Sequence, residues 1–470
     1  MPQTERMSAL ELRASMSLAS IYGLRMLGMF LILPIFSIYA ETLPGGDSHL
    51  LIGLALGAYG LTQAIFQLPF GMASDRYGRK RMIYIGLVIF VIGSLIAGFA
   101  QDLYTVIIGR AIQGAGAVSA AVTALVADLT REEHRTKAMA MIGGTIGVTF
   151  ALSLILGPAL NQWIGIPGIF LLTGALAALA ILDVKFLVPD PLISRFHSDA
   201  EAAPNKLKEV LKDTQLLRLN FGIFALHAAQ MAMFVVVPFA IKQTSGMNEN
   251  QHWQIYLPVM LVSFALMVPA IIYGEKRARL KQVFVGSIAV MLAAQLLFAS
   301  SVDLFWGIVI SLTAYFIAFN VLEASLPSII SKLAPAASKG TAIGVYNTSQ
   351  SLGVFVGGVL GGYLSHFHGY SAVFIFCSVL MALWLLFALT MKAPPAVRSK
   401  MYHLDEMSPD RAKLLSAELA ALPGVREAVV LPDEGIVILK VNMQQDWDED
   451  SVLSLISAEP STTANQSGST

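Results

Sequence analysis

The sequence is poor in charge. Only 13% of its 470 residues are charged, whereas soluble domains typically carry about 25%. The 31 basic and 31 acidic side chains cancel at pH 7, so the chain lacks the basic excess of nucleic-acid-binding proteins. These shortages argue against a cytosolic enzyme and against a nucleic-acid-binding protein.

Cysteine is nearly absent. Cys377 is the single one, so no internal disulfide can form. The sequence also has no G-x-x-x-x-G-K-[ST] loop, which argues against a built-in ATPase, and no spaced set of catalytic residues. We therefore expect no enzyme activity, no cofactor and no metal site.

Apolar residues, in contrast, make up 56% of the chain. They gather in runs that are long enough to cross the roughly 30 Å core of a bilayer as helices, which takes about 20 residues. The sequence predicts an all-α polytopic membrane protein with twelve transmembrane helices, at about 17–40, 50–73, 82–100, 103–127, 137–160, 166–188, 217–243, 252–274, 282–301, 304–330, 340–363 and 369–392.

The connections between these runs differ in charge. Lysine and arginine gather in one alternating set of loops, such as 74–81, 129–137 and 275–281, while Lys242 is the only basic residue in the other set. Basic loops stay on the cytoplasmic side. We expect a multi-pass protein of the cell inner (plasma) membrane with both termini in the cytoplasm.

A long loop divides the runs into six and six, and the two halves resemble each other. The segment from Leu68 to Arg81 is similar to that from Val268 to Lys281, which indicates a duplicated six-helix unit; chance similarity of two basic loops is the alternative. The predicted domains are a six-helix bundle (1–188), a cytoplasmic linker (189–216), a second six-helix bundle (217–392), a linker (393–400), a cytoplasmic domain (401–457) and a disordered tail (458–470).

One loop carries a specific motif. Its residues Gly71, Asp75, Arg76, Gly78, Arg79 and Lys80 fit G-x-x-x-D-R-x-G-R-K. This segment resembles the loop between the second and third helices of the major facilitator superfamily. The resemblance implies two six-helix bundles and a loop that latches them in the outward-facing state, with Asp75 facing the start of the eleventh helix. It also implies that Asp128 pairs with Arg79, although an ordinary cap or salt bridge explains Asp128 nearly as well.

Two further segments resemble motifs of that superfamily. Arg110, Gln113, Gly114 and Gly116 fit the fourth-helix motif R-x-x-Q-G-x-G, in which the arginine assists proton coupling. The fifth span contains a glycine-rich segment similar to the antiporter motif, but Ala159 and Leu160 follow where that motif continues with glycine. The residues of this fifth-helix segment are Gly147, Gly157 and Pro158.

Four ionisable residues lie well inside predicted spans, namely Arg25, Arg110, His227 and Glu323. Charges at this depth are costly and usually functional. Glu323 is the best candidate for carrying a proton, and a structural ion pair with Arg25 or another cation is the alternative. His227 is a second proton-coupling candidate, although a hydrogen bond between helices explains it as well. Asn320 adds a neutral polar group to the same cavity.

The segment after Lys392 has a different pattern. Ser408 and Pro409 start a predicted helix that Pro423 and Gly424 end, between one strand and a hairpin, and a second helix follows. The order β-α-β-β-α resembles a small α+β ferredoxin-like domain of the heavy-metal-associated kind. Metal binding is not expected, because the segment has no cysteine and His403 alone is not a site. Docking on the transporter, self-association and binding of a small regulatory ligand stay open as its roles.

Together these features favour a secondary active transporter. The resemblance implies proton-coupled efflux, or antiport, of small amphiphilic compounds by alternating access, as in multidrug efflux. The partners would be a small-molecule substrate, protons and the lipid bilayer, without nucleic acid. A nutrient uniporter or symporter of the same fold is one alternative, and a membrane ligand sensor that signals through the C-terminal domain is the other.

Overall fold

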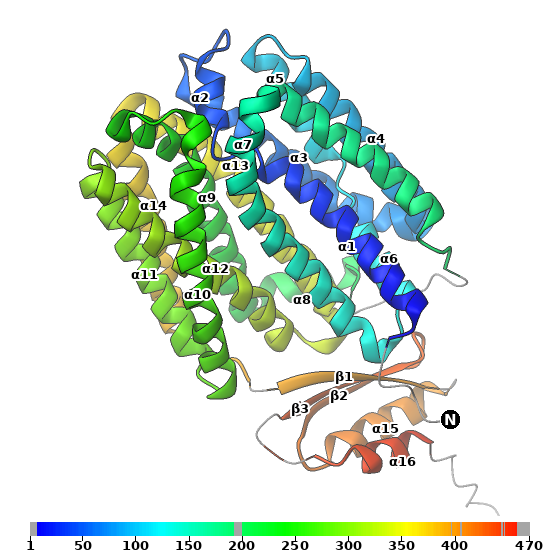
Figure 1. Cartoon of the computed structure of the whole chain (residues 1–470). Helices are drawn as coiled ribbons and strands as arrows, with labels where there is room; N and C mark the ends of the chain where they lie inside the picture. The colour runs from blue at the N-terminus through cyan, green and yellow to red at the C-terminus, as the bar shows by residue number, and fades with distance from the viewer. Residues whose placement is uncertain are drawn as a thin grey trace, which may run out of the picture. The chain divides into compact units, whose positions relative to one another are not determined.

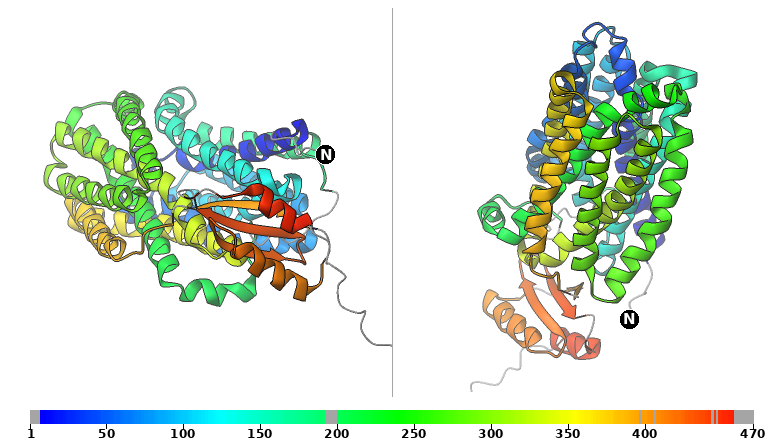
Figure 2. Two further views of the ribbon diagram at one scale, coloured as in Figure 1. Left: turned by 90° about the horizontal axis from the view of Figure 1, so that it is seen from below. Right: turned by 90° about the vertical axis from the view of Figure 1, so that its left-hand side faces the viewer.

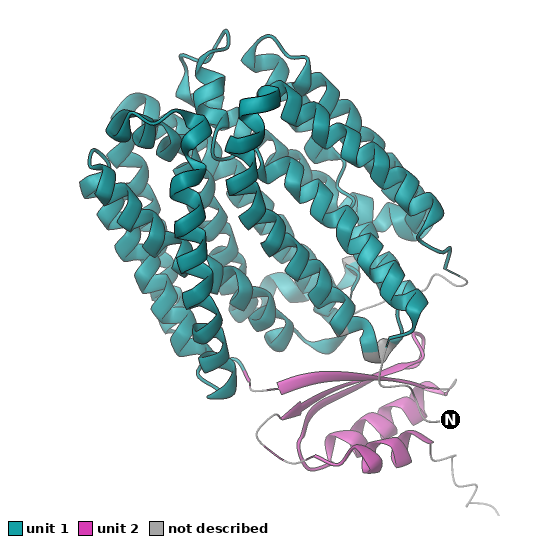
Figure 3. Ribbon diagram, viewed as in Figure 1, with its two compact units in different colours: residues 1–394 teal, residues 395–470 magenta. Residues whose placement is uncertain are grey.

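A computed structural model describes residues 7–191, 200–395, 397–404, 407–442, 445 and 447–457. The chain forms two compact units, residues 1–394 and 395–470 (Figure 3). Each unit has a hydrophobic core of its own. The predicted disordered tail, residues 458–470, lies outside the described residues.

The first unit is built from helices (Figure 1). They are α1 (Ala9–Phe30), α2 (Phe36–Glu41), α3 (His49–Tyr77), α4 (Arg79–Gly98), α5 (Leu103–Ala115), α6 (Ser119–Leu129), α7 (Glu132–Phe186), α8 (Leu207–Lys212), α9 (Thr214–Ser245), α10 (Trp253–Lys276), α11 (Leu280–Ser301), α12 (Phe305–Leu333), α13 (Lys339–His368) and α14 (Tyr370–Leu389), with short 3-10 turns at Pro204–Lys206, Glu249–Gln251 and Ala336–Ser338. Figure 2 shows the first half, in blue to cyan, mostly on one side and the second half, in green to yellow, on the other.

Among the described residues, nine helical stretches are long and apolar enough to cross a membrane. One of them, Lys137–Phe186, has 50 residues and would extend about 75 Å as a straight helix. Its backbone turns at Gly165, where φ is 67°, so it supplies two crossings. Helices α1 and α13 are also long enough to cross a membrane, but they are less apolar than the nine stretches. Adding both and counting the long stretch twice gives the twelve predicted crossings.

The outward surface of this unit is apolar. Leu261 on α10, Ile310 on α12 and Leu386 on α14 are 63%, 58% and 59% exposed. Helix α9, by contrast, is almost entirely enclosed by its neighbours. Large exposed apolar surface is disfavoured in water but suits contact with lipid tails. The helices therefore bury their polar groups inside the bundle and turn apolar side chains to the bilayer.

Two predicted spans are broken rather than continuous. The predicted helix 17–40 is interrupted between α1 and α2, where Pro34 cannot donate a backbone hydrogen bond. The predicted helix 103–127 is interrupted between α5 and α6, where a Cβ on Gly116 would lie 2.3 Å from the carbonyl oxygen of Gly86. Irregular backbone is tolerated at this depth when protein surrounds it, and Ala117 and Val118 are buried.

Helices α3 and α13 join the two halves along their length. A Cβ on Gly53 would lie 2.0 Å from the carbonyl oxygen of Gly358, so the two backbones touch here. At one end of this pair, His49 Nδ1 is 2.8 Å from Ser365 Oγ. We call this the His49 end, and the end that carries Asp75 and Arg79 the basic end.

The second unit is a small α+β fold. It contains β1 (Val397–His403), α15 (Pro409–Ala420), β2 (Val425–Leu431), β3 (Ile436–Asn442) and α16 (Glu449–Ser457). Its antiparallel sheet has the order β1-β3-β2. This is the ferredoxin-like order without a fourth strand. Leu415, Leu419 and Val452 fill the core between the helices and the sheet.

Two element boundaries differ from the sequence prediction. Strand β1 starts at Val397, inside the predicted linker 393–400, because Val397 pairs with Asn442 of β3. Helix α9 starts at Thr214, inside the predicted linker 189–216, because the Asp213 side chain accepts hydrogen bonds from two backbone N–H groups of its first turn. Local pairing and capping thus extend both elements beyond their apolar runs.

Candidate functional site

The side chain of Arg79 is the centre of the basic end. Helix α3 ends at Tyr77, the next residue is Gly78, whose φ of 100° suits glycine, and Arg79 begins α4. The guanidinium forms an ion pair with Asp75, donates to Ser74 Oγ at 3.0 Å, and lies 3.3 Å from Asp128 Oδ2. The Arg79 side chain is only 3% exposed. The structure therefore brings Arg79 and Asp128 together, as the motif resemblance suggested.

A third carboxylate meets Arg79 from the linker between the halves. Glu201 Oε1 is 2.7 Å from Arg79 Nη2, and the Glu201 side chain is 4% exposed. Burying charges is costly unless good partners meet them, and here three carboxylates surround one cation. Sequence reasoning missed Glu201, because a single acidic residue in an irregular linker carries no periodic or motif signal.

The linker backbone beside Glu201 lies on the start of α13. A Cβ on Gly340 would be 2.2 Å from the Glu201 carbonyl oxygen, and Ala203 N donates to Thr341 Oγ1 at 2.9 Å. Glu201 is thus fixed to the second half by its backbone and to the first half by its side chain. This segment connects the two halves at the basic end.

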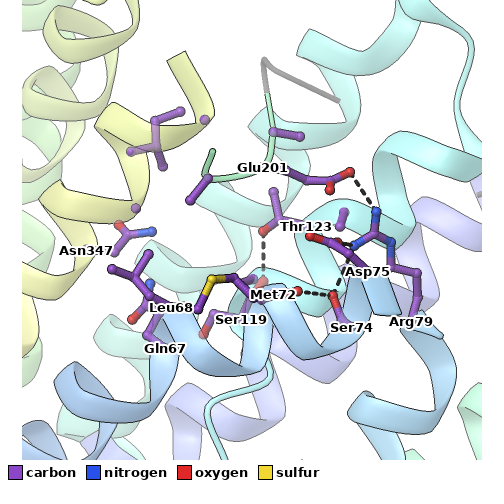
Figure 4. A pocket seen from close by; sticks show the side chains of 18 residues that line it. Gln67, Leu68, Met72, Ser74, Asp75, Arg79, Ser119, Thr123, Glu201 and Asn347 are labelled. Carbon is purple, nitrogen blue, oxygen red and sulfur yellow. Dashed lines mark hydrogen bonds and ion pairs between the residues drawn. The ribbon is translucent and has the colours of Figure 1, made fainter. Parts of the chain in front are cut away.

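A pocket opens beside this network (Figure 4). Helices α3, α6 and α13 and linker residues 200–202 line it. Asp75, Glu201 and Arg79 lie at one side, and Gln67 and Ser119 lie at another. Asp75 thus shares the pocket with the first residues of α13, Gly340 and Gly344, but its contact is with Arg79.

The other residues of this motif pack locally. Lys80 Nζ lies 2.7 Å from the carbonyl oxygen of Val188 and 2.9 Å from Asp190 Oδ1. The Arg76 guanidinium lies over the ring of Tyr77, 5.4 Å from its centroid. A Cβ on Gly71 would be 3.2 Å from Ala120 Cβ, so a small residue lets α3 approach α6. Lys80 therefore braces the start of α4 against the segment that follows α7.

The fourth-helix motif forms a buried polar chain. Arg110 Nη1 donates to Gln113 Oε1 at 2.9 Å, and Gln113 Nε2 donates to Ser94 Oγ at 2.8 Å. A Cβ on Gly114 would lie 2.1 Å from the carbonyl oxygen of Tyr59. The arginine and glutamine of the motif thus interact, while its glycines permit close helix packing.

The fifth-helix motif is divided by its surroundings. A Cβ on Gly157 would meet the carbonyl oxygen of Leu31 at 2.2 Å, so Gly157 packs on the break in the first span. Pro158 lies within α7. Gly147 has nothing within 4 Å of a Cβ position. The structure therefore gives Gly157 a packing role that Gly147 does not share.

The buried ionisable residues make the following contacts within their own half of the molecule. Arg25 Nη1 donates to Ser119 Oγ at 2.6 Å, within the first half. Glu323 Oε2 is 3.8 Å from His227 Nε2, within the second half, and Gln350 Nε2 lies 2.7 Å from the same histidine atom. Glu323 thus lies near His227, in the half that does not contain Arg25.

Asn320 belongs to the second half as well. Its Nδ2 donates to Ser263 Oγ at 2.9 Å. Asn320 therefore links α12 to α10 one turn before Glu323. A residue that sequence reasoning missed here is Gln350, since glutamines in a long apolar run are common and its contact with His227 crosses two distant helices.

Comparison with known proteins decides the family. The model of the Major Facilitator Superfamily matches residues 18–358 and, in a second match, residues 278–404. The chain belongs to this superfamily. It is 41% identical over 438 residues to the inner membrane transport protein YajR of Escherichia coli strain K12, across 93% of this chain and 96% of YajR.

More distant relatives share the membrane part. The quinolone resistance protein NorA of Staphylococcus aureus is 25% identical over 375 residues, covering 76% of this chain and 91% of NorA. Multidrug resistance protein 2 of Bacillus subtilis is 27% identical over 354 residues, covering 72% and 85%.

Among solved structures, a bacterial homologue of the human lysosomal transporter Spinster, inward-facing and occupied, matches with a TM-score of 0.67. Its identity is 14%, over 82% of this chain and 97% of that one, which shows the fold alone. The predicted major facilitator fold with a small α+β C-terminal domain is confirmed. The chain is a multi-pass membrane protein and a secondary transporter, not an enzyme.

Proposed function

We propose that this transporter exports small amphiphilic compounds in exchange for protons. The relatives named for quinolone and multidrug resistance support this class of substrate. The loop charges support an orientation with both termini in the cytoplasm, and the name of the YajR relative supports the inner membrane. The basic end is then the cytoplasmic end.

The observation that carries the proton coupling is the position of Glu323. It lies in the middle of α12, beside His227 of α9 and reached by Gln350 of α13 through that histidine. Among apolar helices there is little water to solvate a carboxylate. A carboxyl group there tends to become neutral by binding a proton. Glu323 takes up a proton when its side of the cavity opens outward and releases it when that side opens inward.

The loop at the basic end supplies the gate in this cycle. Rocking of the two halves opens one end while the other closes. The contact of Arg79 with Glu201, whose backbone is fixed on the second half, holds the cytoplasmic end together and separates when that end opens, while Asp75 and Asp128 hold Arg79 in place within the first half. Because these partners are charged, the gate resists partial opening, in which a buried charge would lose its partner.

Proteoliposomes with an acidic lumen test the exchange directly. An antiporter accumulates norfloxacin inside them while a pH-sensitive dye in the lumen reports rising pH; protein-free vesicles correct for leakage. We expect Glu323→Gln to abolish accumulation while some probe exchange without a gradient persists. Glu209→Gln, on the exposed linker helix, is the control. Accumulation driven by an acidic outside would instead indicate symport, and unchanged pH-driven transport by Glu323→Gln would clear Glu323 of this role.

A further inference from the structure

Two buried arginines in the first half have guanidinium N–H groups to spare. Arg25 and Arg110 are 3% and 0% exposed. Each donates from Nη1, to Ser119 and Gln113 respectively. Within the described part of the chain, Nε and Nη2 of both arginines have no hydrogen-bond partner. Neither arginine forms an ion pair with a described carboxylate.

The two cations lie on one aromatic ring. The guanidinium carbons of Arg25 and Arg110 are 5.6 Å and 4.9 Å from the ring centroid of Tyr59. The two charges are therefore no more than 10.5 Å apart, the sum of these distances. Cation–π contacts are favourable, but they do not offset two like charges held together away from water. An arrangement of this kind requires an anion to neutralise it.

A broken helix adds positive potential at the same place. Helix α6 has 11 residues and begins at Ser119, the residue to which Arg25 donates. Its N-cap, Val118, makes no side-chain cap hydrogen bond. The first N–H groups of a helix carry partial positive charge, and transporters place such half-helix starts against anionic parts of substrates.

This place is next to the pocket of the basic end. Ser119 and Gln67 line that pocket, so Arg25 lies directly behind its wall. The nearby acids are engaged elsewhere, since Asp75, Asp128 and Glu201 meet Arg79 and Glu323 lies by His227 in the other half. The positive charge beside Ser119 is thus left for a ligand that enters through the pocket.

We propose that Arg25, Arg110 and the start of α6 bind the oxyanion of an amphiphilic substrate, a carboxylate or a phosphate. Nε and Nη2 of each guanidinium group supply the donors, and the Tyr59 ring fixes the spacing of the two groups. This assignment rests on the proposed function only in taking the bound molecule to be the one transported. It makes the substrates anionic or zwitterionic rather than purely cationic.

Binding to full-length protein in nanodiscs of neutral lipid tests this site without any proton gradient. The probes share one ring system and differ in charge: 2-naphthoate, 2-naphthyl phosphate and the neutral 2-naphthamide. We expect one of the two anions to bind at least about tenfold more tightly than the amide. Arg25→Gln and Arg110→Gln each remove this preference, and Arg13→Gln, an exposed arginine on the same helix as Arg25, keeps it.

Thermal unfolding of the ligand-free variants shows whether a loss of anion binding is caused by misfolding. An arginine that is buried without a counter-ion destabilises the folded protein. The variants Arg25→Gln and Arg110→Gln should therefore melt no lower than the wild type. A repeat in nanodiscs with phosphatidylglycerol identifies the source of the oxyanion, because a lipid head group in the site would compete with 2-naphthoate. Loss of binding there assigns the site to lipid, and unchanged binding assigns it to a free amphiphile.

Equal binding of 2-naphthamide and both anions to the wild type would overturn the assignment, as would an anion preference that survives both arginine substitutions. These outcomes are separable from the proposed function. The binding assay contains no proton gradient, so its result does not depend on Glu323 carrying a proton. Proton-coupled movement of ethidium without anion preference would refute this site and leave antiport standing. An anion preference in binding without proton-coupled transport would support this site and refute antiport.

Discussion

At the scale of single residues, Arg79 differs from an ordinary surface arginine in its burial and in the origin of its partners. Asp75 is close in sequence, Asp128 comes from another helix of the same half, and Glu201 comes from the linker. Only the last of these contacts ties Arg79 to a segment fixed on the second half. Glu201 is therefore the member of the network whose contact changes when the halves separate.

We expect Glu201→Gln to loosen the basic end. A hydrogen bond between charged groups contributes about 1.5–3 kcal/mol, and the amide retains part of it, so the population of open molecules should rise about tenfold. A cysteine at Thr123, which lines the pocket, reports this as faster maleimide labelling in a chain with Cys377 replaced by alanine. Glu209→Gln is the matched control, and equal labelling rates in both variants would contradict the role of Glu201.

The sequence anticipated part of this site. The spacing from Gly71 to Lys80 indicated the loop. The presence of ionisable residues inside predicted spans indicated Arg25, Arg110 and Glu323. It did not identify Glu201, which is 122 positions from Arg79, or Tyr59 as the ring between two arginines. Contacts of that kind depend on which helices become neighbours, and an aromatic residue in an apolar run has no distinctive pattern.

At the scale of elements, the close packing of α3 on α13 depends on glycine. The backbones touch at Gly53 and Gly358, and a clash with a carbonyl oxygen cannot be relieved by a side-chain rotation. The same halves also contain glycines without such constraints. Gly143 on α7 has nothing within 4 Å of a Cβ position.

We expect Gly53→Ala to destabilise the first unit by about 1–3 kcal/mol, because α3 and α13 must move apart to admit the methyl group. Gly143→Ala should be neutral or stabilising by up to about 1 kcal/mol, since alanine is the better helix former. Thermal unfolding of the purified protein in detergent compares the two. A drop for Gly143→Ala as large as that for Gly53→Ala would show that the contact with Gly358 is not the cause.

In the second unit, Glu449 connects α16 to the sheet. It accepts from Lys400 Nζ at 2.7 Å and from Tyr402 Oη at 2.6 Å. Partial burial raises the pKa of Glu449, but these hydrogen bonds and the charge of Lys400 outweigh burial and hold the pKa below the ordinary value of 4.5. The carboxylate thus stabilises the folded unit above about pH 4.5, and this contribution is lost as the pH falls through the lowered pKa.

Glu449→Gln should therefore reduce the stability of residues 395–457 at pH 7, by about 1 kcal/mol or less because the side chain is 45% exposed. The difference from the wild type should shrink below pH 4.5. Thermal unfolding of this segment expressed alone, followed by circular dichroism, measures it, with Asp410→Asn on the exposed start of α15 as a control. A difference that grows in acid would contradict the stated sign.

Element boundaries show where sequence reasoning reaches its limit. Long apolar runs predict the crossings, because lipid leaves the backbone no alternative to a helix. They do not predict the breaks after Phe30 and Ala115. Proline is no guide to these, since Pro69 and Pro238 lie within continuous helices while Pro34 lies in a break. Whether a break is tolerated depends on which neighbours enclose it.

At the scale of the whole molecule, the halves are joined at both ends by different means. At the His49 end the side-chain contacts are direct, between His49 and Ser365 and between Asn161 and Asn250. At the basic end the connection through Glu201 involves the linker. Alternating access requires these ends to separate in turn.

A cross-link at the His49 end should therefore stop transport. We expect His49→Cys with Ser365→Cys, in a chain with Cys377 replaced by alanine, to lose most substrate movement when treated with a short bifunctional thiol reagent that reduction can cleave. Reduction should restore it. Each single-cysteine variant serves as a control, and full transport by the cross-linked protein would mean that the His49 end need not open.

Each half also has an ion pair at its basic end, and the charges of the two pairs are arranged in opposite order. At the end of α6, Asp128 meets Arg79, whereas at the end of α12, Lys332 meets Glu275 at 2.8 Å. These helices hold equivalent places in the two halves, so exchange of α6 and α12 between the halves during assembly would set Asp128 beside Glu275 and Lys332 beside Arg79. Repulsion in both pairs would penalise that arrangement. In a chain built from two similar bundles, these four charges thus specify which helix belongs to which bundle, and they act during assembly, before any substrate is moved.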